Sequence, residues 1–393
     1  MEQEIFAERI VRVPRSFIRE ILKVSLDPGI ISFAGGLPNR DLFPVSAMEA
    51  ASARAFELHG RDMLQYSSSE GLLPLRRYIA DRYLRRKGLR IPAEDILITN
   101  GSQQGLDLLG KALINAGDAV VIEEPGYLGA IQSLSVYRPR FVPVTLGDDG
   151  LDIAELRAAT DGRGVKMMYC VPSFQNPSGV TYTGANRRQV AEVADARGFF
   201  VVEDDPYGEL RFSGSDQPSF AAMIPERTIL LGSFSKIVAP GLRIGWIVAP
   251  EAIREKLLVA KQASDLNTSG FTQQILCQYL QDNDLDAHIA CIVEAYGRQC
   301  RAMVDSIGRH LPDTITWTRP EGGMFLWGRL PRGLSAMKLF EHAAREKVVF
   351  VPGDPFYTAE TDVPALRFNF TCANEQTIEE GMIRFSRAFR QVM

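Results

Sequence analysis

Two neighbouring stretches decide how this chain is read: Leu-Gly-Ser-Phe-Ser-Lys at residues 231–236 and Pro-Gly-Leu-Arg-Ile-Gly-Trp at residues 240–246. An apolar run ends in two hydroxyls and Lys236, and Arg243 follows beyond a Pro-Gly turn. A lysine amine forms Schiff bases with carbonyl compounds, and hydroxyls with an arginine suit a phosphate. Pyridoxal phosphate (PLP) carries both an aldehyde and a phosphate, so the segment predicts a PLP site. Taken alone, Lys236 could equally be a solvated surface lysine.

The pattern around this segment predicts an α/β fold. From about residue 95, short β-rich runs alternate with helix-like segments such as 103–114 and 187–196. Continuous apolar strands separated by helices indicate a mostly parallel sheet buried on both faces, a three-layer architecture. In such sheets functional groups gather at the carboxyl ends of the strands. The expected strands are residues 96–99, 119–123, 141–145, 166–171, 199–203, 228–234 and 242–248.

The pattern changes after about residue 284. A long helix is expected over 285–310, and shorter elements follow it to the end of the chain. We therefore expect a large domain over 46–284 and a smaller α+β domain over 285–393. The elements of the smaller domain are strands at 314–317, 324–330, 348–351 and 366–370, with helices near 335–346 and 375–391.

Composition narrows the class of protein. The 393 residues are 46% apolar and 23% charged, with a net charge of −4, which is typical of a globular enzyme and gives no general attraction to nucleic acid. No apolar run reaches the roughly 18 residues of a membrane helix, and the acidic start does not resemble a signal peptide, so a cytoplasmic location is expected. Five cysteines without metal-type spacing are expected to be reduced. Four scattered histidines give no support for a metal site or a Ser-His-Asp triad.

Three further motifs follow predicted strands. Asn-Gly-Ser-Gln-Gln-Gly at 100–105 opens a helix with Ser102 as the expected N-cap, and free N–H groups at a helix start bind anions. Glu-Pro-Gly-Tyr at 124–127 would present an aromatic ring, and Phe-Gln-Asn-Pro at 174–177 is a turn. Each of them alone could be a plain cap or turn.

Glu-Asp-Asp-Pro-Tyr at 203–207 is more specific. Carboxylates directly after an apolar strand are costly unless they have partners. A carboxylate beside the pyridine nitrogen of PLP keeps that nitrogen protonated, so that the ring can accept electrons. The D-x-x-Y spacing to Tyr207 favours Asp204 for this role, with Asp205 as the alternative.

These motifs, in this order and over nearly the whole chain, resemble the fold-type I aminotransferases of class I/II, and in particular their 2-aminoadipate, kynurenine and LysN-like subgroup. The resemblance implies that Lys236 carries PLP and acts as general base, that Asp204 meets the pyridine nitrogen and that Tyr127 stacks on the ring. It implies that Asn176 and Tyr207 bind the phenolic oxygen of PLP. It assigns the phosphate to Gly101, Ser102, Gln103, Ser233, Ser235 and Arg243.

The resemblance also implies substrate contacts and a dimer. Arg367, in the alternating segment 365–370, would bind the substrate α-carboxylate together with Asn176. Arg19 would meet a distal carboxylate, and Gly36 would line the pocket. Tyr66 would reach the phosphate of a neighbouring subunit, so that a homodimer shares its active sites. Residues 1–45 would form an N-terminal arm and helix associated with the small domain.

The expected function is PLP-dependent transfer of an amino group from an L-amino acid of the 2-aminoadipate, aromatic or branched-chain type to 2-oxoglutarate, by a ping-pong mechanism. A β-lyase on the same fold stays open, because it would use the same lysine and the same electron sink. A MocR-like sensing domain is a second alternative, although no basic helix-turn-helix segment precedes the arm. A Rossmann dehydrogenase is disfavoured, because residues 101–105 do not supply G-x-G-x-x-G.

Overall fold

The computed structural model describes residues 5–11, 13, 27, 29–359 and 362–393. Its centre is an eight-stranded sheet in the order β2-β9-β8-β7-β6-β3-β4-β5. The five strands from β8 to β4 run parallel, whereas β9 is antiparallel to both of its neighbours and β5 is antiparallel to β4. The strands are β2 (Ile96–Thr99), β3 (Ala119–Glu124), β4 (Arg140–Gly147), β5 (Gly150–Leu151), β6 (Val165–Cys170), β7 (Phe200–Asp204), β8 (Thr228–Ser233) and β9 (Gly245–Val248).

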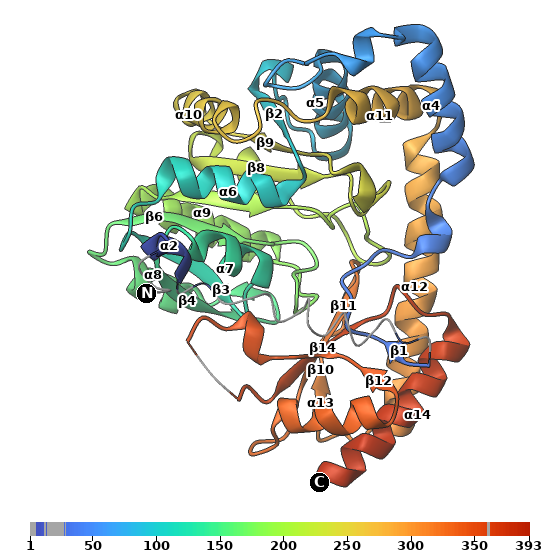
Figure 1. Cartoon of the computed structure of the whole chain (residues 1–393). Helices are drawn as coiled ribbons and strands as arrows, with labels where there is room; N and C mark the ends of the chain where they lie inside the picture. Colours follow the sequence, from blue (N-terminus) through green and yellow to red (C-terminus); the bar gives the residue numbers. More distant parts are fainter. Residues whose placement is uncertain (1–4, 12, 14–26, 28, 360–361) are drawn as a thin grey trace.

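The central sheet is buried on both faces because its strands are apolar at successive positions. In β7, Val201 packs into one apolar cluster and Val202 into the other. Alternate side chains of a strand point to opposite faces, so the two clusters are the two sides of the sheet. Figure 1 shows the helices flanking the sheet. One group is α6 (Ser102–Leu113), α7 (Leu128–Ser135) and α10 (Glu251–Gln262), and the other is α8 (Ile153–Thr160) and α9 (Gly184–Arg197). The predicted three-layer, mostly parallel α/β architecture is confirmed.

Several helices connect the central sheet with the C-terminal part of the molecule. Helix α11 (Gly270–Asp282) packs on α4 (Val45–His59), and α5 (Leu73–Lys87) lies near them. The long helix α12 (Leu285–His310) runs from that region down to the C-terminal part of the molecule (Figure 1). A short helix, α2 (Glu8–Val11), lies near the N-terminus.

The C-terminal part contains a four-stranded antiparallel sheet in the order β10-β11-β14-β13. A separate parallel pair joins β1 (Ile31–Ser32) to β12 (Val348–Val349), so residues near the start of the chain lie beside the C-terminal segment. The division of the chain near residues 45 and 284 stays a prediction. The remaining elements are β10 (Thr316–Trp317), β11 (Phe325–Arg329), β13 (Val351–Pro352), β14 (Ala365–Asn369), α13 (Ala336–Arg345) and α14 (Glu375–Val392).

Two predicted strands differ from the structure. The strand expected over 242–248 begins only at Gly245, because Pro240–Leu242 form a 3-10 turn and Arg243 takes a left-handed conformation with φ 54°. Proline has no N–H for a strand ladder, which favours the turn. The strand expected over 348–351 is divided, because β12 pairs with β1 whereas β13 pairs with β14.

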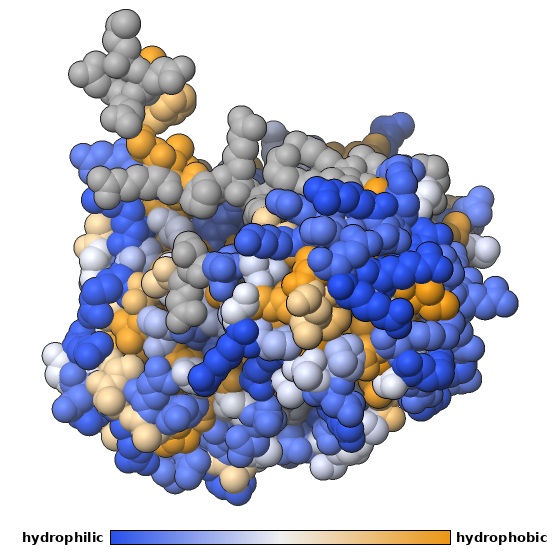
Figure 2. Space-filling model, turned by 90° about the horizontal axis from the view of Figure 1, so that it is seen from below, coloured by the Kyte–Doolittle hydropathy of each residue, from blue (hydrophilic) through white to orange (hydrophobic). Residues whose placement is uncertain are grey.

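The polarity of the surface and of the helices agrees with the ordinary share of apolar and charged residues in the sequence. Figure 2 shows hydrophilic side chains spread over the face in view, with apolar side chains in small groups between them. Among the described residues, no helix is both long and apolar enough to cross a membrane. Within the same ranges, no cluster of three or more His, Cys, Asp or Glu side chains could hold a metal ion. All five cysteines are free.

Candidate active site

The residues predicted from scattered motifs meet in one cavity of about 380 Å³. The cavity lies at the carboxyl ends of the parallel strands β7 and β8. Its other side is formed by Arg367 on β14, a strand of the four-stranded sheet. A volume of this size suits a cofactor together with a small substrate. The predicted residues that line the cavity are Gly36, Ser102, Gln103, Tyr127, Asn176, Asp204, Tyr207, Ser233, Ser235, Lys236, Arg243 and Arg367.

One end of the cavity is suited to a phosphate. Helix α6 begins there with Gly101 as its N-cap, and the guanidinium of Arg243 lies against the loop and donates to Asn100 O at 3.1 Å. Ser233 and Ser235 hydroxyls lie 2.9 Å apart. Free N–H groups at a helix start, hydroxyls and an arginine together form an anion site.

Gly101, rather than Ser102, is the N-cap, so the prediction for Ser102 was wrong by one position. Gly101 has φ 74°, a conformation that side chains with a Cβ rarely adopt. A Cβ built there would lie 2.6 Å from Nη2 of Arg243. The glycine therefore allows the loop and the arginine to approach each other, and Ser102 becomes the first helical residue.

Lys236 lines the cavity, and its Nζ donates to Gly36 O at 2.9 Å. The pKa of Lys236 is lowered to about 8, chiefly by burial; the positive charges of Arg367 and Arg243 also lower it, and Cys372 opposes them. A buried amine with a depressed pKa is suited to act as a nucleophile or a base.

Asp204 ends β7 and is held by a residue that the sequence motifs did not single out. Tyr169 on the neighbouring strand β6 donates its hydroxyl to Asp204 Oδ2 at 2.7 Å. The other oxygen, Oδ1, is buried and has no hydrogen-bond partner among the described residues. Burial raises the pKa of Asp204 to about 7, whereas the Tyr169 hydrogen bond lowers it.

Asp205 points elsewhere, which bears on the alternative that the sequence left open. Its carboxylate lies 3.5 Å from Nζ of Lys87 on α5, and Asp205 is not among the residues that line the cavity. The geometry therefore favours Asp204 over Asp205 as the carboxylate that faces a ligand.

Arg367 and Asn176 form the opposite wall. Nη1 of Arg367 donates to Asn176 Oδ1 at 2.8 Å, and Nη2 donates to Ala34 O at 2.6 Å. Asn176 Nδ2 in turn donates to the hydroxyl of Tyr207 at 3.3 Å. Arg367 is 1% exposed, and burial lowers its pKa to about 10. Its Nε is buried and has no partner among the described residues, so the guanidinium keeps a free donor.

Comparisons with known proteins agree with this geometry. Residues 29–385 match the family model for aminotransferase class I and II. The chain belongs to the class I and II aminotransferases. It is 40% identical to aromatic-amino-acid aminotransferase 1 of Thermococcus litoralis, over 100% of this chain and 95% of that protein. It is 39% identical to the 2-aminoadipate transaminase of Thermus thermophilus, over 99% of this chain and 98% of that protein.

A solved structure of the same family has the same fold. LysN, the α-aminoadipate aminotransferase of Thermus thermophilus, complexed with N-(5'-phosphopyridoxyl)-L-leucine, matches with a TM-score of 0.93 and 38% identity. The match covers 100% of this chain and 99% of that one. The chain is therefore a PLP-dependent aminotransferase of the LysN-like subgroup.

The side chains of the aminotransferase fit this cofactor. A buried carboxylate oxygen without a partner among the described residues, Asp204 Oδ1, is available for a protonated ring nitrogen. Lys236 supplies an amine in the same cavity, and the start of α6 with Arg243 supplies an anion site. Tyr127, at the N-cap of α7, is a cavity-lining aromatic whose pKa is raised to about 12, chiefly by burial.

Two described residues among those predicted for the aminotransferase site are not among the residues that line the cavity. Gly101 is the N-cap beside the cavity-lining Ser102. Tyr66 is 81% exposed. Arg19 lies outside the described residues. Leu37, Val171, Pro206 and Pro240 also line the cavity, although no motif pointed to them.

Glu123, a buried carboxylate at the end of β3, is a second residue that the motifs missed. It accepts hydrogen bonds from the Tyr182 hydroxyl at 2.7 Å, Val171 N at 3.0 Å and Gln175 Nε2 at 3.0 Å. All three partners are donors, so the arrangement suits an ionised carboxylate, although burial raises the pKa of Glu123 to about 7. Because Gln175 precedes Asn176, this hub holds the loop that carries Asn176.

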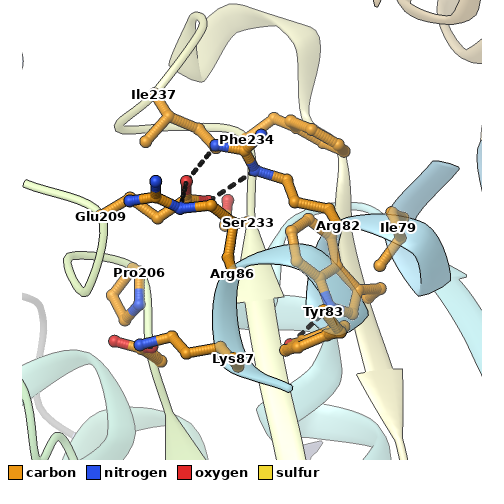
Figure 3. Close-up of a pocket in the computed structure, with 12 residues that line it drawn as sticks. Ile79, Arg82, Tyr83, Arg86, Lys87, Pro206, Glu209, Ser233, Phe234 and Ile237 are labelled. Atoms are coloured by element: carbon orange, nitrogen blue, oxygen red, sulfur yellow. Dashed lines mark hydrogen bonds and ion pairs between the residues drawn. The ribbon is translucent and has the colours of Figure 1, made fainter. Parts of the chain in front are cut away.

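A second pocket, which shares Pro206 and Ser233 with the cavity, lies between α5 and the residues that follow β7 (Figure 3). Its charged groups are paired with one another. Arg82, buried, donates to Glu209 and, at 2.8 Å, to Asp286. The Tyr83 hydroxyl accepts from Trp246 Nε1 at 3.0 Å. These contacts join α5 to the segment that follows Asp204, to α12 and to β9, so we infer that the pocket is structural.

Proposed function

We propose that the enzyme transfers the amino group of an L-amino acid of the aromatic, 2-aminoadipate or branched-chain type to 2-oxoglutarate in a ping-pong reaction. The observation that carries the proposal is the single cavity that unites Lys236, Asp204 and Arg367. The two relatives described above are named for aromatic amino acids and for 2-aminoadipate, which supports these donor classes.

When bound, PLP supplies an aldehyde that joins to amines and a ring that accepts the electron pair released at the substrate Cα. Lys236 is the residue to hold it, and Nζ of Lys236 then acts as the general base that removes the proton from the substrate Cα. The depressed pKa of Lys236 favours both roles, because only the neutral amine is a nucleophile or a base. Asp204 Oδ1 would keep the ring nitrogen protonated.

Arg367 would bind the substrate α-carboxylate. A guanidinium can form two parallel hydrogen bonds to a carboxylate, and Asn176 orients Nη1 of Arg367. Phe325 and Phe356 pack against the guanidinium, at 4.4 and 5.3 Å from ring centroid to Cζ. These rings exclude water and fix the plane of the guanidinium, which strengthens its interaction with an anion.

The remaining assignments follow the same geometry. Ser102, Gln103, Ser233, Ser235 and Arg243, with the backbone of Gly101, would bind the cofactor phosphate. Tyr127 would stack on the ring, and Tyr207 with Asn176 would bind its phenolic oxygen. We place Gly36 at the substrate, since its carbonyl already contacts Lys236.

Exposed Tyr66 supports a shared site in a homodimer. A tyrosine that is 81% exposed on one copy can reach the phosphate site of another copy.

Five free cysteines agree with action in the reducing cytoplasm. Arg19 is proposed, from the sequence alone, to meet a distal carboxylate, so Arg19→Ala should reduce activity with 2-aminoadipate more than activity with leucine.

The test is the visible absorption spectrum of the purified protein, recorded before and after the addition of single L-amino acids. We expect a cofactor band that bleaches with a donor and returns with 2-oxoglutarate, and the fastest donor identifies the substrate class. Pyruvate and ammonia formed from cysteine-type substrates would instead indicate a β-lyase. A band that no amino acid bleaches would contradict transamination and favour a sensing domain.

A further inference from the structure

The segment that begins α6, at the proposed phosphate end of the cavity, is hydrogen-bonded to the connection between α10 and α11. Asp265, in that connection, accepts two hydrogen bonds on Oδ2, from Asn100 Nδ2 at 2.5 Å and from Gln104 Nε2 at 2.8 Å. Asn100 and Gln104 lie on either side of Gly101, Ser102 and Gln103, and we call residues 100–104, the turn into α6 with its first helical residues, the loop. One carboxylate oxygen therefore joins both ends of the loop that begins α6.

The loop is also closed within itself. The side-chain oxygen of Gln104 accepts the backbone N–H of Asn100 at 2.8 Å. With its Oε1 on the backbone and its Nε2 on Asp265, Gln104 has a fixed orientation. These contacts determine the direction in which the N–H groups between them point.

Lys261, on the last turn of α10, completes the network. Its side chain is fully buried, and Nζ lies 3.0 Å from Asp265 Oδ1, 3.3 Å from Gln104 Oε1 and 3.0 Å from Thr268 Oγ1. Burial lowers the pKa of Lys261, and the contact with Asp265 opposes this. A buried ammonium is tolerated only when it is paired, so Lys261 and Asp265 depend on each other.

We propose that Asp265 and Lys261 are positioning residues for the cofactor phosphate. They do not line the cavity themselves, and the negative charge of Asp265 would by itself disfavour a phosphate. They act by holding the loop in its binding conformation before the phosphate arrives, so that binding does not have to order the loop. The positive charge of Lys261 offsets the charge of Asp265.

The inference rests on the proposed phosphate role of the loop. Comparing two ligands, one with a phosphate and one without, distinguishes this role of Asp265 from a purely structural one. Pyridoxal has the ring and aldehyde of PLP but no phosphate. If Asp265 acts on the phosphate loop, its removal weakens PLP and leaves pyridoxal unchanged. If Asp265 only supports the fold, both ligands weaken together.

The experiment titrates the apoprotein with PLP and, separately, with pyridoxal, and follows binding by absorbance. For Asp265→Ala we expect PLP to bind about 10- to 30-fold more weakly, from the lost preorganisation of the loop, and pyridoxal to stay within about twofold. Asp265→Asn keeps a side-chain oxygen that can accept both hydrogen bonds, so it should lose less than Asp265→Ala. Lys261→Met should follow Asp265→Ala, because it leaves Asp265 without its buried counter-charge.

Asp107→Ala is the matched control. Asp107 lies on α6, one turn after Gln104, and accepts hydrogen bonds from Lys111 and Tyr137 rather than from Asn100 or Gln104. It should leave both affinities unchanged. Equal weakening of PLP and pyridoxal by Asp265→Ala, or no weakening of PLP, would overturn the inference. A wild-type protein that prefers PLP to pyridoxal but does not transaminate would contradict the proposed function alone.

Discussion

The hydroxyl of Tyr169 donates a 2.7 Å hydrogen bond to Oδ2 of Asp204, while Oδ1 of the same carboxylate is buried without a partner among the described residues. The two residues lie on adjacent strands, with Tyr169 paired to Val202 in the register of β6 and β7. Burial raises the pKa of Asp204 to about 7, and the hydrogen bond from Tyr169 opposes that rise. Tyr169 therefore favours an ionised Asp204 with one oxygen free for the cofactor.

Tyr169→Phe removes only this hydroxyl. A hydrogen bond to a charged group contributes about 1.5–3 kcal/mol, so we expect the pKa of Asp204 to rise by about one to two units. Infrared titration of the apoprotein, with Asp204→Asn to identify the carboxyl band, measures that pKa directly. We expect PLP affinity and turnover to fall about 10- to 100-fold. An unchanged carboxyl titration in Tyr169→Phe would contradict this role.

The reactivity of Lys236 should follow its depressed pKa. In the apoprotein, the rate at which an amine-reactive reagent labels Lys236 should rise with pH through about 8, because only the neutral amine reacts. Peptide mapping locates the label, and Lys236→Ala removes it and abolishes turnover. A labelling midpoint near 10.5, the ordinary value for lysine, would show that the site does not desolvate the amine.

The lowered pKa of Lys236 should also make the free energy of unfolding depend on pH, in a direction that follows from the two pKa values. The folded-state pKa of Lys236 is about 8 and the unperturbed value is 10.5, so the unfolded chain binds more protons between these pH values. The contribution of Lys236 to the free energy of unfolding therefore rises with pH across that window. Lys236→Met should flatten this part of the pH–stability curve of the apoprotein in denaturant titrations. An unaltered curve would argue against the depressed pKa.

Arg367→Ala tests carboxylate recognition. Leaving a carboxylate unpaired in a buried site costs about 2–5 kcal/mol, so kcat/KM for every amino acid should fall about 30- to 4000-fold. PLP affinity should change little. Arg329→Ala is the control, because Arg329 lies on the neighbouring strand β11 with a half-exposed side chain. A similar loss in both variants would remove Arg367 from substrate binding.

Mixed subunits test the shared active site. Lys236→Ala and Tyr66→Ala chains should each be impaired at limiting PLP. After they are unfolded together and refolded, half of the dimers should be mixed, and one of the two sites in each mixed dimer keeps both residues. Activity should then recover to about a quarter of the wild-type value. No recovery, in a mixture shown by mass to contain mixed dimers, would place Tyr66 outside the site.

Arg187 on α9 supports the fold rather than the site. It is 1% exposed and donates to Pro172 O at 2.8 Å and Ser173 Oγ at 3.1 Å, near the buried Glu203. Arg187→Ala leaves that carboxylate without its counter-charge and should cost about 3–5 kcal/mol of unfolding free energy. The adjacent exposed Arg188 should cost under about 0.5 kcal/mol when replaced by alanine. Urea titration compares the two, and equal costs would contradict the assignment.

Much of the site could be read from the chain because each motif is local. The apolar strand before Ser233 and Lys236, and the D-x-x-Y spacing of Asp204 and Tyr207, carry their information within a few residues. Continuous apolar runs separated by helix-like segments likewise predicted the parallel sheet, since each run can be recognised within a few residues. Twelve of the predicted residues line one cavity, because parallel strands end at the same edge.

Partners that are distant along the chain could not be predicted in this way. Asp265 is 165 positions from Asn100, and nothing in the sequence around Asp265 distinguishes it from a surface carboxylate. Tyr169 looks like an ordinary core aromatic until β6 is seen beside β7. The start of β9 was also mispredicted, since Arg243 takes a left-handed conformation after a 3-10 turn and its guanidinium donates to Asn100 O, a partner distant along the chain.

The sequence by itself determined the chemistry of this protein, because the reactive groups and the anion-binding helix start are encoded in short segments with fixed spacing. Only the tertiary structure decided how those groups are tuned: the depressed pKa of Lys236, the oxygen of Asp204 that has no hydrogen-bond partner among the described residues, and the hydrogen bonds that Asn100 and Gln104 donate to Asp265. The physical reason is that pKa values and loop rigidity depend on burial and on hydrogen bonds from other elements, which form only when the strands and helices pack.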